Sequence, residues 1–164
     1  MIRAALLLVV AVTLAACQQP SLTGIAAGVG REMAPPRAPL ADPADATFAF
    51  LPFPGIPGNV SDALLRRIWL RAGQEGLTVI KRPGGPALFT VEGSLTATSN
   101  ETNSLIFYVF DVKDISGRRL HRIVGEQRSE ESGGDPWDNV NRDDLDLIAI
   151  RLSALINAWL NAGA

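Results

Sequence analysis

The sequence predicts an α+β domain, a two-layer sandwich in which two helices cover one face of a mostly antiparallel sheet. Three observations lead to this prediction. Residues 62–75 and 142–160 each carry one broad apolar stripe of helical period. Three β-prone segments between residues 87 and 127 follow one another closely, as strands of a meander do. Two shorter strand-like segments flank the first helix, which gives the order β-α-β-β-β-β-α.

The first strand is expected at residues 47–53, which are aromatic and interrupted by proline. Pro52 has no backbone donor, so this strand should lie at an edge of the sheet or end just before that residue. A proline- and glycine-rich turn leads to the first helix, for which Ser61 is the expected N-cap. Gly76 is expected to end the helix as its C-cap.

The remaining strands are expected at four places. Residues 77–82 form a short strand, and residues 87–98 alternate between apolar and polar side chains as a half-buried strand does. Residues 104–112 are apolar on both parities, so this strand should be central in the sheet or covered on both faces. A hairpin loop with Gly117 in the left-handed conformation leads to the strand of residues 119–127.

A polar, glycine-rich loop, residues 128–137, precedes the last helix. Asn141 is a suitable N-cap for this helix. Three aspartates in its first turns lie near the positive end of the helix dipole, namely Asp143, Asp144 and Asp146.

The first seventeen residues determine the expected location of the protein. Arg3 precedes an apolar run, residues 4–16, which has the length of a signal-peptide core and is too short for a membrane-spanning helix of about 20 residues. The run ends in Leu14, Ala15, Ala16 and Cys17. These four residues resemble the lipobox of bacterial lipoproteins. The resemblance implies cleavage before Cys17, diacylglycerol on its sulfur and acylation of the new amino terminus. The alternative is an ordinary secretory signal with an incidental cysteine.

We therefore expect a signal peptide at residues 1–16, an acylated cysteine with a flexible tether at residues 17–46, and a single α+β domain at residues 47–164. Because each buried CH₂ of an acyl chain contributes ~0.8 kcal/mol, two or three chains anchor a protein stably in a membrane. Gln18 favours the outer membrane, since an aspartate at this position retains enteric lipoproteins in the inner membrane. The domain should then face the periplasm.

Composition excludes several function classes. Removal of residues 1–16 leaves 148 residues (164 − 16), which is enough for one domain with a hydrophobic core. The remaining part has 14 basic and 17 acidic side chains, so no excess of basic residues supports nucleic-acid binding. Cys17 is the only cysteine and His121 the only histidine, which excludes a disulfide and a multi-histidine metal centre within one chain. We expect no metal site and no cofactor.

The order of elements, together with the hairpin around Gly117, resembles a class of small periplasmic lipoproteins. This class includes the N-terminal domain of TolB, similar domains of LpoB, PelC and CsgG, and LptE. The resemblance covers residues 47–160 and contains no catalytic motif. Three phrases are shared more closely with α-proteobacterial lipoproteins to which no activity is attached, namely residues 108–112, 120–123 and 135–137. The resemblance implies a non-enzymatic binding or scaffolding domain of the cell envelope, with an LptE-like component of the lipopolysaccharide translocon as an alternative.

Four side chains are candidates for partner binding. Arg118, Arg119 and Arg122 lie at the tip of the predicted hairpin, where they would meet an envelope protein, a glycan or lipopolysaccharide. The plainer interpretation is that they protect an exposed strand end from unwanted pairing. Trp137 stands in the loop before the last helix and is either a surface anchor or a cap of the sheet.

The alternative function is a periplasmic hydrolase in which His121 acts with a carboxylate such as Asp111 or Glu126. No serine or aspartate spacing points to such a site, so we expect no enzymatic activity. The acidic side chains of residues 126–138 also lack the alternating pattern of a calcium-binding loop. A third possibility is a structural protein without a specific partner.

Overall fold

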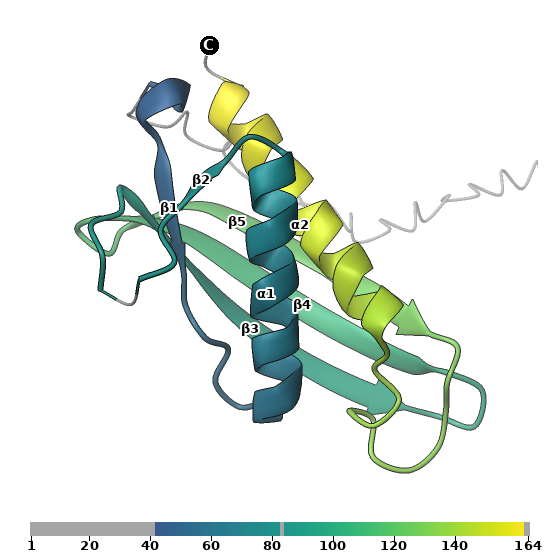
Figure 1. Cartoon of the computed structure of the whole chain (residues 1–164). Helices are drawn as coiled ribbons and strands as arrows, with labels where there is room; N and C mark the ends of the chain where they lie inside the picture. The colour runs from purple at the N-terminus through teal and green to yellow at the C-terminus, as the bar shows by residue number, and fades with distance from the viewer. Residues whose placement is uncertain (1–41, 83, 163–164) are drawn as a thin grey trace, which may run out of the picture. The chain divides into compact units, whose positions relative to one another are not determined.

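The computed structural model describes residues 42–82 and 84–162. The predicted signal peptide, Cys17 and the tether up to residue 41 lie outside the described residues. The described part contains one five-stranded sheet with two helices on one of its faces (Figure 1). The predicted α+β two-layer sandwich is therefore confirmed. Neither α-helix of residues 42–82 and 84–162 combines the length and the hydrophobicity that a membrane span requires.

The order of the elements agrees with the predicted one, apart from a short additional turn at the start. In chain order they are the 3-10 turn η3 (Pro43–Asp45), strand β1 (Thr47–Phe50), helix α1 (Gly58–Gln74), strand β2 (Thr78–Val79), strand β3 (Phe89–Ser99), strand β4 (Ser104–Asp114), strand β5 (Arg119–Ser129) and helix α2 (Arg142–Asn161). Ala46, which follows the turn η3, is buried in the core of the domain.

The strands lie in the order β2-β1-β3-β4-β5. Strands β3, β4 and β5 form the predicted antiparallel meander, with β4 in the middle. Strand β1 runs parallel to both β2 and β3 and is therefore interior, not at an edge. It ends at Phe50, before Pro52, so the second of the two predicted outcomes is the correct one. The Leu51 N–H still donates to the Val91 carbonyl at 3.0 Å, which carries the ladder with β3 one residue further.

The start of α1 differs from the sequence-based prediction. The helix begins at Gly58 directly after Pro57, whose carbonyl accepts from the Ser61 N–H at 2.9 Å. Ser61 is thus inside the first turn and is not the N-cap. Its buried hydroxyl accepts a hydrogen bond from the Phe53 N–H at 3.1 Å instead, so it fixes the loop that leads into the helix. Pro57 occupies the N-cap position, where its missing N–H costs no hydrogen bond of the helix.

The predicted N-cap of α2 is confirmed, whereas the C-cap of α1 is Glu75 and the predicted Gly76 is the residue after it. Gly76 follows α1 with a φ of +81°, a conformation that favours glycine. The Asn141 side chain accepts from the N–H groups of Asp143 and Asp144, and the Asp144 carboxylate accepts from the Asn141 N–H in return. Asp144 is buried and also accepts from the Gln127 side chain at 3.1 Å. The start of α2 is therefore fixed to strand β5 by hydrogen bonds.

The core lies between the sheet and the two helices. Strand β4 contributes three apolar side chains that are fully buried, Ile106, Phe110 and Val112. The helices contribute Leu64 and Ile68 from α1, and Ile148, Leu152 and Ile156 from α2, all of them fully buried. These residues follow the predicted apolar stripes, so the predicted helix faces are confirmed.

Candidate binding surface

The sheet has a second face that carries no helix. Within residues 42–82 and 84–162, both helices pack on the same side of the sheet (Figure 1). Side chains of alternate residues in β4 and β5 point to the opposite side, because successive residues of a strand face opposite ways. We call this side the outer face.

Four apolar side chains lie in the middle of the outer face, and we call them the outer apolar strip. They are Leu105, Phe107, Val109 and Val124. Phe107 is 43% exposed and Val124 is 67% exposed. Val109 and Val124 are direct cross-strand partners. Large apolar side chains that remain exposed and adjacent on a rigid sheet are typical of surfaces that bind other molecules.

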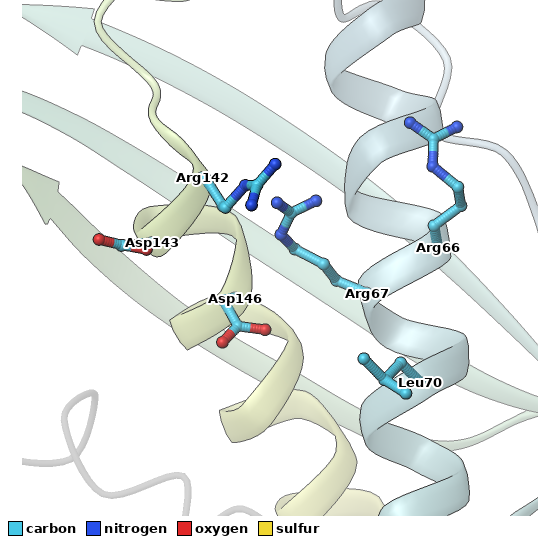
Figure 2. Close-up of a pocket in the computed structure, with 6 residues that line it drawn as sticks. All are labelled: Arg66, Arg67, Leu70, Arg142, Asp143 and Asp146. Atoms are coloured by element: carbon cyan, nitrogen blue, oxygen red, sulfur yellow. The ribbon is translucent and has the colours of Figure 1, made fainter.

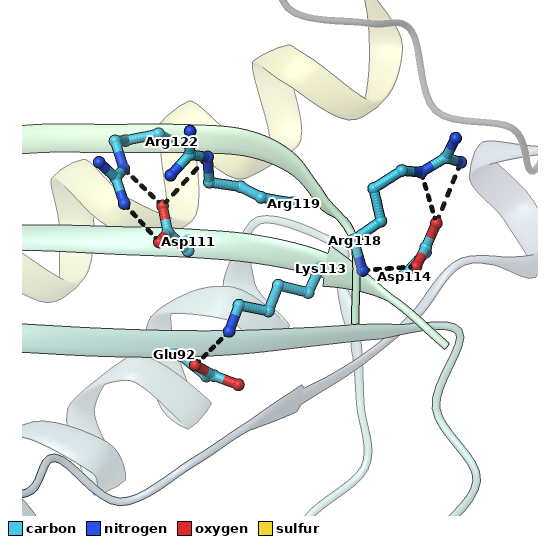
Figure 3. Close-up of polar contacts among 7 residues, drawn as sticks. All are labelled: Glu92, Asp111, Lys113, Asp114, Arg118, Arg119 and Arg122. Atoms are coloured by element: carbon cyan, nitrogen blue, oxygen red, sulfur yellow. Dashed lines mark hydrogen bonds and ion pairs between the residues drawn. The ribbon is translucent and has the colours of Figure 1, made fainter. Parts of the chain in front are cut away.

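Charged side chains continue the outer face toward the hairpin between β4 and β5. Arg122 donates two hydrogen bonds to the carboxylate of Asp111, both at 2.7 Å, and Arg119 lies 3.9 Å from the same carboxylate (Figure 3). The bond from Arg122 is the main reason that the pKa of Asp111 lies below its usual value, and the pKa of Arg122 is raised in turn. Asp111 and Arg122 therefore carry full charges that neutralise each other.

Arg118 is hydrogen-bonded within the hairpin turn. The carboxylate of Asp114 accepts from the hydroxyl of Ser116 at 2.6 Å, and from the N–H and side chain of Arg118, both at 3.0 Å (Figure 3). The Ser116 hydroxyl is the largest cause of the lowered pKa of Asp114. Gly117 has a φ of +78°, as predicted for this turn. Nearby, Lys113 pairs with Glu92 across β3 and β4.

The three predicted arginines lie on the β4–β5 hairpin in two separate places, and each is beside a carboxylate. Arg118 pairs with Asp114, and Arg122 pairs with Asp111, to which Arg119 also lies close. Such exposed pairs contribute only about 0–1 kcal/mol each to stability. Their effect is mainly to fix side-chain positions and to remove net charge from the end of the outer face. A phosphate group would have to compete with a carboxylate already in place.

His121 lies on the other side of the sheet from Asp111. Its strand partner is the buried Val112, and its ring stacks on that of Trp159 with centroids 5.4 Å apart and an interplanar angle of 2°. Burial lowers the pKa of His121, so its neutral form is favoured. Glu126 belongs to the outer face, as Arg122 does. The structure thus does not bring His121 together with either carboxylate that the hydrolase hypothesis assigned to it.

Trp137 is half-buried and packs against the core, which matches the cap of the sheet more than an exposed anchor. The backbone N–H of Trp137 donates to the Asp135 side chain at 2.9 Å, which forms a local turn. Hydrogen bonds of a buried side chain also fix the loop around Trp137. The buried Asn139 side chain donates to the Ser104 hydroxyl at 2.9 Å and to the Gly133 carbonyl at 2.7 Å.

A groove of about 330 Å³ separates the two helices on their solvent side. Arg66, Arg67 and Leu70 of α1 and Arg142, Asp143 and Asp146 of α2 line it (Figure 2). Asp146 is bound by Arg71, whose Nε lies 3.0 Å from one carboxylate oxygen. This hydrogen bond is the main cause of the lowered pKa of Asp146 and joins the two helices. Because the groove mixes cations and anions, it has no clear preference for a ligand of either sign.

The sequence indicates the hairpin but does not reveal two features of this surface. The pairing of each arginine with its own aspartate depends on the register of β4 against β5, which a single sequence does not specify. The outer apolar strip is visible in the sequence as apolar residues on both parities of residues 104–112, but that pattern equally indicates a central strand. Among the described residues, no group of three or more His, Cys, Asp or Glu side chains is arranged to hold a metal ion.

The comparisons with known proteins concern the fold. No protein-family model matches this chain, and no curated protein does. The chain is similar to PelC from Paraburkholderia phytofirmans, a dodecamer, with 13% identity, 75% of this chain and 92% of that chain covered, and a TM-score of 0.51. TolB from Acinetobacter baumannii is 12% identical over 71% of this chain and 28% of its own, with a TM-score of 0.44. A lipoprotein from Neisseria meningitidis is 13% identical over 71% of this chain and 98% of its own, with a TM-score of 0.40. At these identities the PelC likeness shows a shared fold and nothing about activity.

Proposed function

We propose that this protein is a lipid-anchored lipoprotein of the cell envelope whose domain binds a partner without catalysing a reaction. The observation that supports the proposal is the exposure of Phe107 and Val124 on the outer face of the sheet. The two helices pack on the opposite face. The lipobox ending in Cys17 supports the anchoring, and Gln18 supports the outer membrane as its place. A domain held at a membrane by acyl chains would present this face to the periplasm.

The partner that fits the outer face best is an envelope protein. The outer apolar strip provides the central contact, and the ion pairs of Asp111 with Arg122 and of Asp114 with Arg118 form a polar rim. An apolar centre with a satisfied polar rim is the usual arrangement of protein interfaces. A glycan or lipopolysaccharide partner, including the role of an LptE-like component, would rely more on free cations, and the hairpin arginines already have carboxylate partners.

The hydrolase alternative receives no geometric support. A general base needs a partner and access to a substrate. His121 instead has Trp159 stacked on its ring, and the two carboxylates considered for it are on the opposite face of the sheet. A His121→Ala variant that complements a deletion strain as well as the unchanged protein would support the binding function.

Cross-linking in intact cells, followed by purification of the full-length protein, tests the proposal. We expect a Phe107→Ser, Val124→Ser double variant to lose most of the cross-linked neighbour, while thermal unfolding shows that the domain remains folded. The matched control is Leu70→Ser, because Leu70 is 57% exposed on α1, away from the outer face. A Cys17→Ser variant should lose acyl labelling and membrane association.

Two results would contradict the proposal. The first is an unchanged set of neighbours in the Phe107→Ser, Val124→Ser variant. The second is a Cys17→Ser protein that remains bound to the membrane like the original. Light scattering of the purified protein belongs to the same experiment, since PelC of the same fold is a dodecamer and the cross-linked neighbour can be a second copy.

A further inference from the structure

Strand β5 ends the sheet with an edge that no other described strand covers. The opposite edge is formed by β2, which has only two residues, whereas β5 has eleven. Proteins protect a long edge from pairing with a proline, a bulge or charged side chains. In β5 the pairing with β4 is irregular only beside the hairpin, and the strand contains no proline. Charged side chains are therefore the one protection that β5 has along most of its length.

The direction of the backbone groups in β5 follows from the pairing of the strands. The Val91 carbonyl accepts from β1, so Val91 forms no ladder hydrogen bond with its β4 partner Val112. Val112 therefore directs its N–H and C=O to β5, where its partner is His121. In an antiparallel ladder this direction alternates from one residue to the next. Since His121 faces β4, the backbone groups of the even-numbered residues from Arg122 to Arg128 point to the open edge.

A hydrogen bond from α2 agrees with this direction. Arg151 donates to the carbonyl of Glu126 at 2.9 Å, as a carbonyl at the open edge can accept. Arg151 also shows which side of α2 faces the edge. Leu147 and Leu155 lie one turn before and one turn after it, on the same side of the helix. Both leucines are exposed, so an apolar helix stripe lies beside the edge of β5.

The charges on this edge are complementary to a second copy of the same edge. If two β5 strands pair antiparallel about a two-fold axis at Val124, Arg122 of each copy lies opposite Glu126 of the other. Opposite charges in such cross-strand positions stabilise a sheet. Glu126 forms no ion pair with another described residue. Arg122 binds Asp111 through Nε and Nη2, which leaves Nη1 for a second carboxylate.

The charges also select this register among the two-fold registers centred on residues 122–126. An axis at Arg122 places two arginines opposite each other, and an axis at Glu126 places two glutamates opposite each other, which is unfavourable. An axis at Gly125 places Arg122 opposite Arg128. An axis at residue 123 pairs Arg122 with Val124 and forms no pair of opposite charges. Only the axis at Val124 combines an apolar contact with two such pairs.

We propose that the edge of β5 binds a second copy of this chain, so that the two sheets join into one continuous sheet. The exposed Val124 side chains meet at the axis on the outer face, while Leu147 and Leu155 of both copies face the junction on the helix side. This interface shares only Val124 with the outer apolar strip and does not depend on the proposed function.

Disulfide formation in intact cells tests the pairing and its register. After oxidation with copper phenanthroline, full-length Val124→Cys should form a disulfide-linked dimer, because Cα atoms of a hydrogen-bonded antiparallel pair lie about 5.5 Å apart. Glu126→Cys is the matched control on the same edge. Its two thiols would lie four residues apart along the paired strands, roughly 13 Å, which a disulfide cannot span. The unchanged protein controls for Cys17.

Charge reversal tests the interface without a cross-link. Sedimentation equilibrium of the purified full-length protein in detergent should show that Glu126→Arg weakens the dimer about tenfold, because arginines then lie opposite each other at two symmetric positions. Glu75→Arg makes the same change of charge at the end of α1 and should leave the dimer unchanged. Phe107→Ser should also leave it unchanged, which separates this interface from a partner of the outer apolar strip.

Three results would overturn the proposal. The first is a Val124→Cys protein that gives no more disulfide-linked dimer than Glu126→Cys does. The second is a full-length protein that sediments as a monomer at millimolar concentration. The third is an assembly that Glu126→Arg leaves as stable as before, since the copies would then meet through another surface.

Discussion

The two faces of one strand differ sharply in this protein. Along β4, the side chains of Ile106 and Phe110 point toward the helices and are fully buried. Their neighbours Phe107 and Asp111 point to the outer face, where one is 43% exposed and the other is paired with Arg122. One strand therefore contributes large apolar side chains to the core on one side and to an exposed surface on the other.

Strand β5 repeats the difference with smaller side chains. Ile123 is buried on the helix side, whereas Val124 is 67% exposed on the outer face. Gly125 leaves space on the helix side for the ring of Tyr108, its partner on β4. The inner face is thus packed tightly enough that stability depends on its details, and the outer face can change with little effect on the fold. Paired substitutions on the two faces test this difference.

The largest effect is expected for the two phenylalanines of β4. Phe110→Ala should lower the free energy of unfolding by about 3–5 kcal/mol, because it leaves a cavity in a dense core. Phe107→Ala should lower it by about 1 kcal/mol or less, since the ring is only partly removed from water. Urea denaturation of both variants measures the difference. Equal losses of stability would show that the outer face is covered in the folded protein.

A smaller effect is expected for the neighbouring pair on β5. A Cβ atom at Gly125 would lie 2.4 Å from the hydroxyl oxygen of Tyr108, which is too close for any side chain. Gly125→Ala should therefore lower the free energy of unfolding by about 1–3 kcal/mol through overpacking. Val124→Ala is the control and should change it by about 0.5 kcal/mol or less. A neutral Gly125→Ala would mean that the Tyr108 ring moves freely, contrary to its close packing.

The inner face is largely predictable from the sequence, because periodicity reports which residues are buried together. The stripes of α1 and α2 identify core residues such as Leu64 and Leu152, and the alternation of residues 87–98 gives the correct face of β3. The Asn141 cap and the Gly117 turn are predictable because their local geometry requires these residue types. The predicted start of α1 is wrong, since Ser61 has the chemistry of an N-cap but Pro57 occupies that position.

The arrangement of side chains on the outer face is much less predictable from the sequence, because it depends on which residues of neighbouring strands are paired. Asp111 and Arg122 are eleven residues apart, and only the register of β4 and β5 makes them partners. The same holds for β1, whose interior position follows from its parallel pairing with β2 and β3.

The smallest effect is expected for the ion pair that ends the outer apolar strip. Hydrogen bonding by Arg122 lowers the pKa of Asp111 in the folded protein. A carboxyl group with a lowered folded pKa stabilises the protein above its unfolded pKa of about 3.9, and this contribution is lost as the pH falls through the folded pKa. Because the side chain of Arg122 is 45% exposed, the contribution should be about 1 kcal/mol or less.

Urea denaturation of Asp111→Asn and the unchanged protein, between pH 7 and pH 3, tests this expectation. The difference in free energy of unfolding should be constant from pH 7 to about pH 5 and should shrink below about pH 4 as Asp111 is protonated. Asp138→Asn is the control, since Asp138 forms no ion pair with another described residue. If Asp111→Asn lowers the free energy of unfolding by well above 1 kcal/mol at pH 7, the ion pair of Asp111 contributes substantially to stability. Stability would then depend on the outer face as well as on the inner face at this end of the sheet.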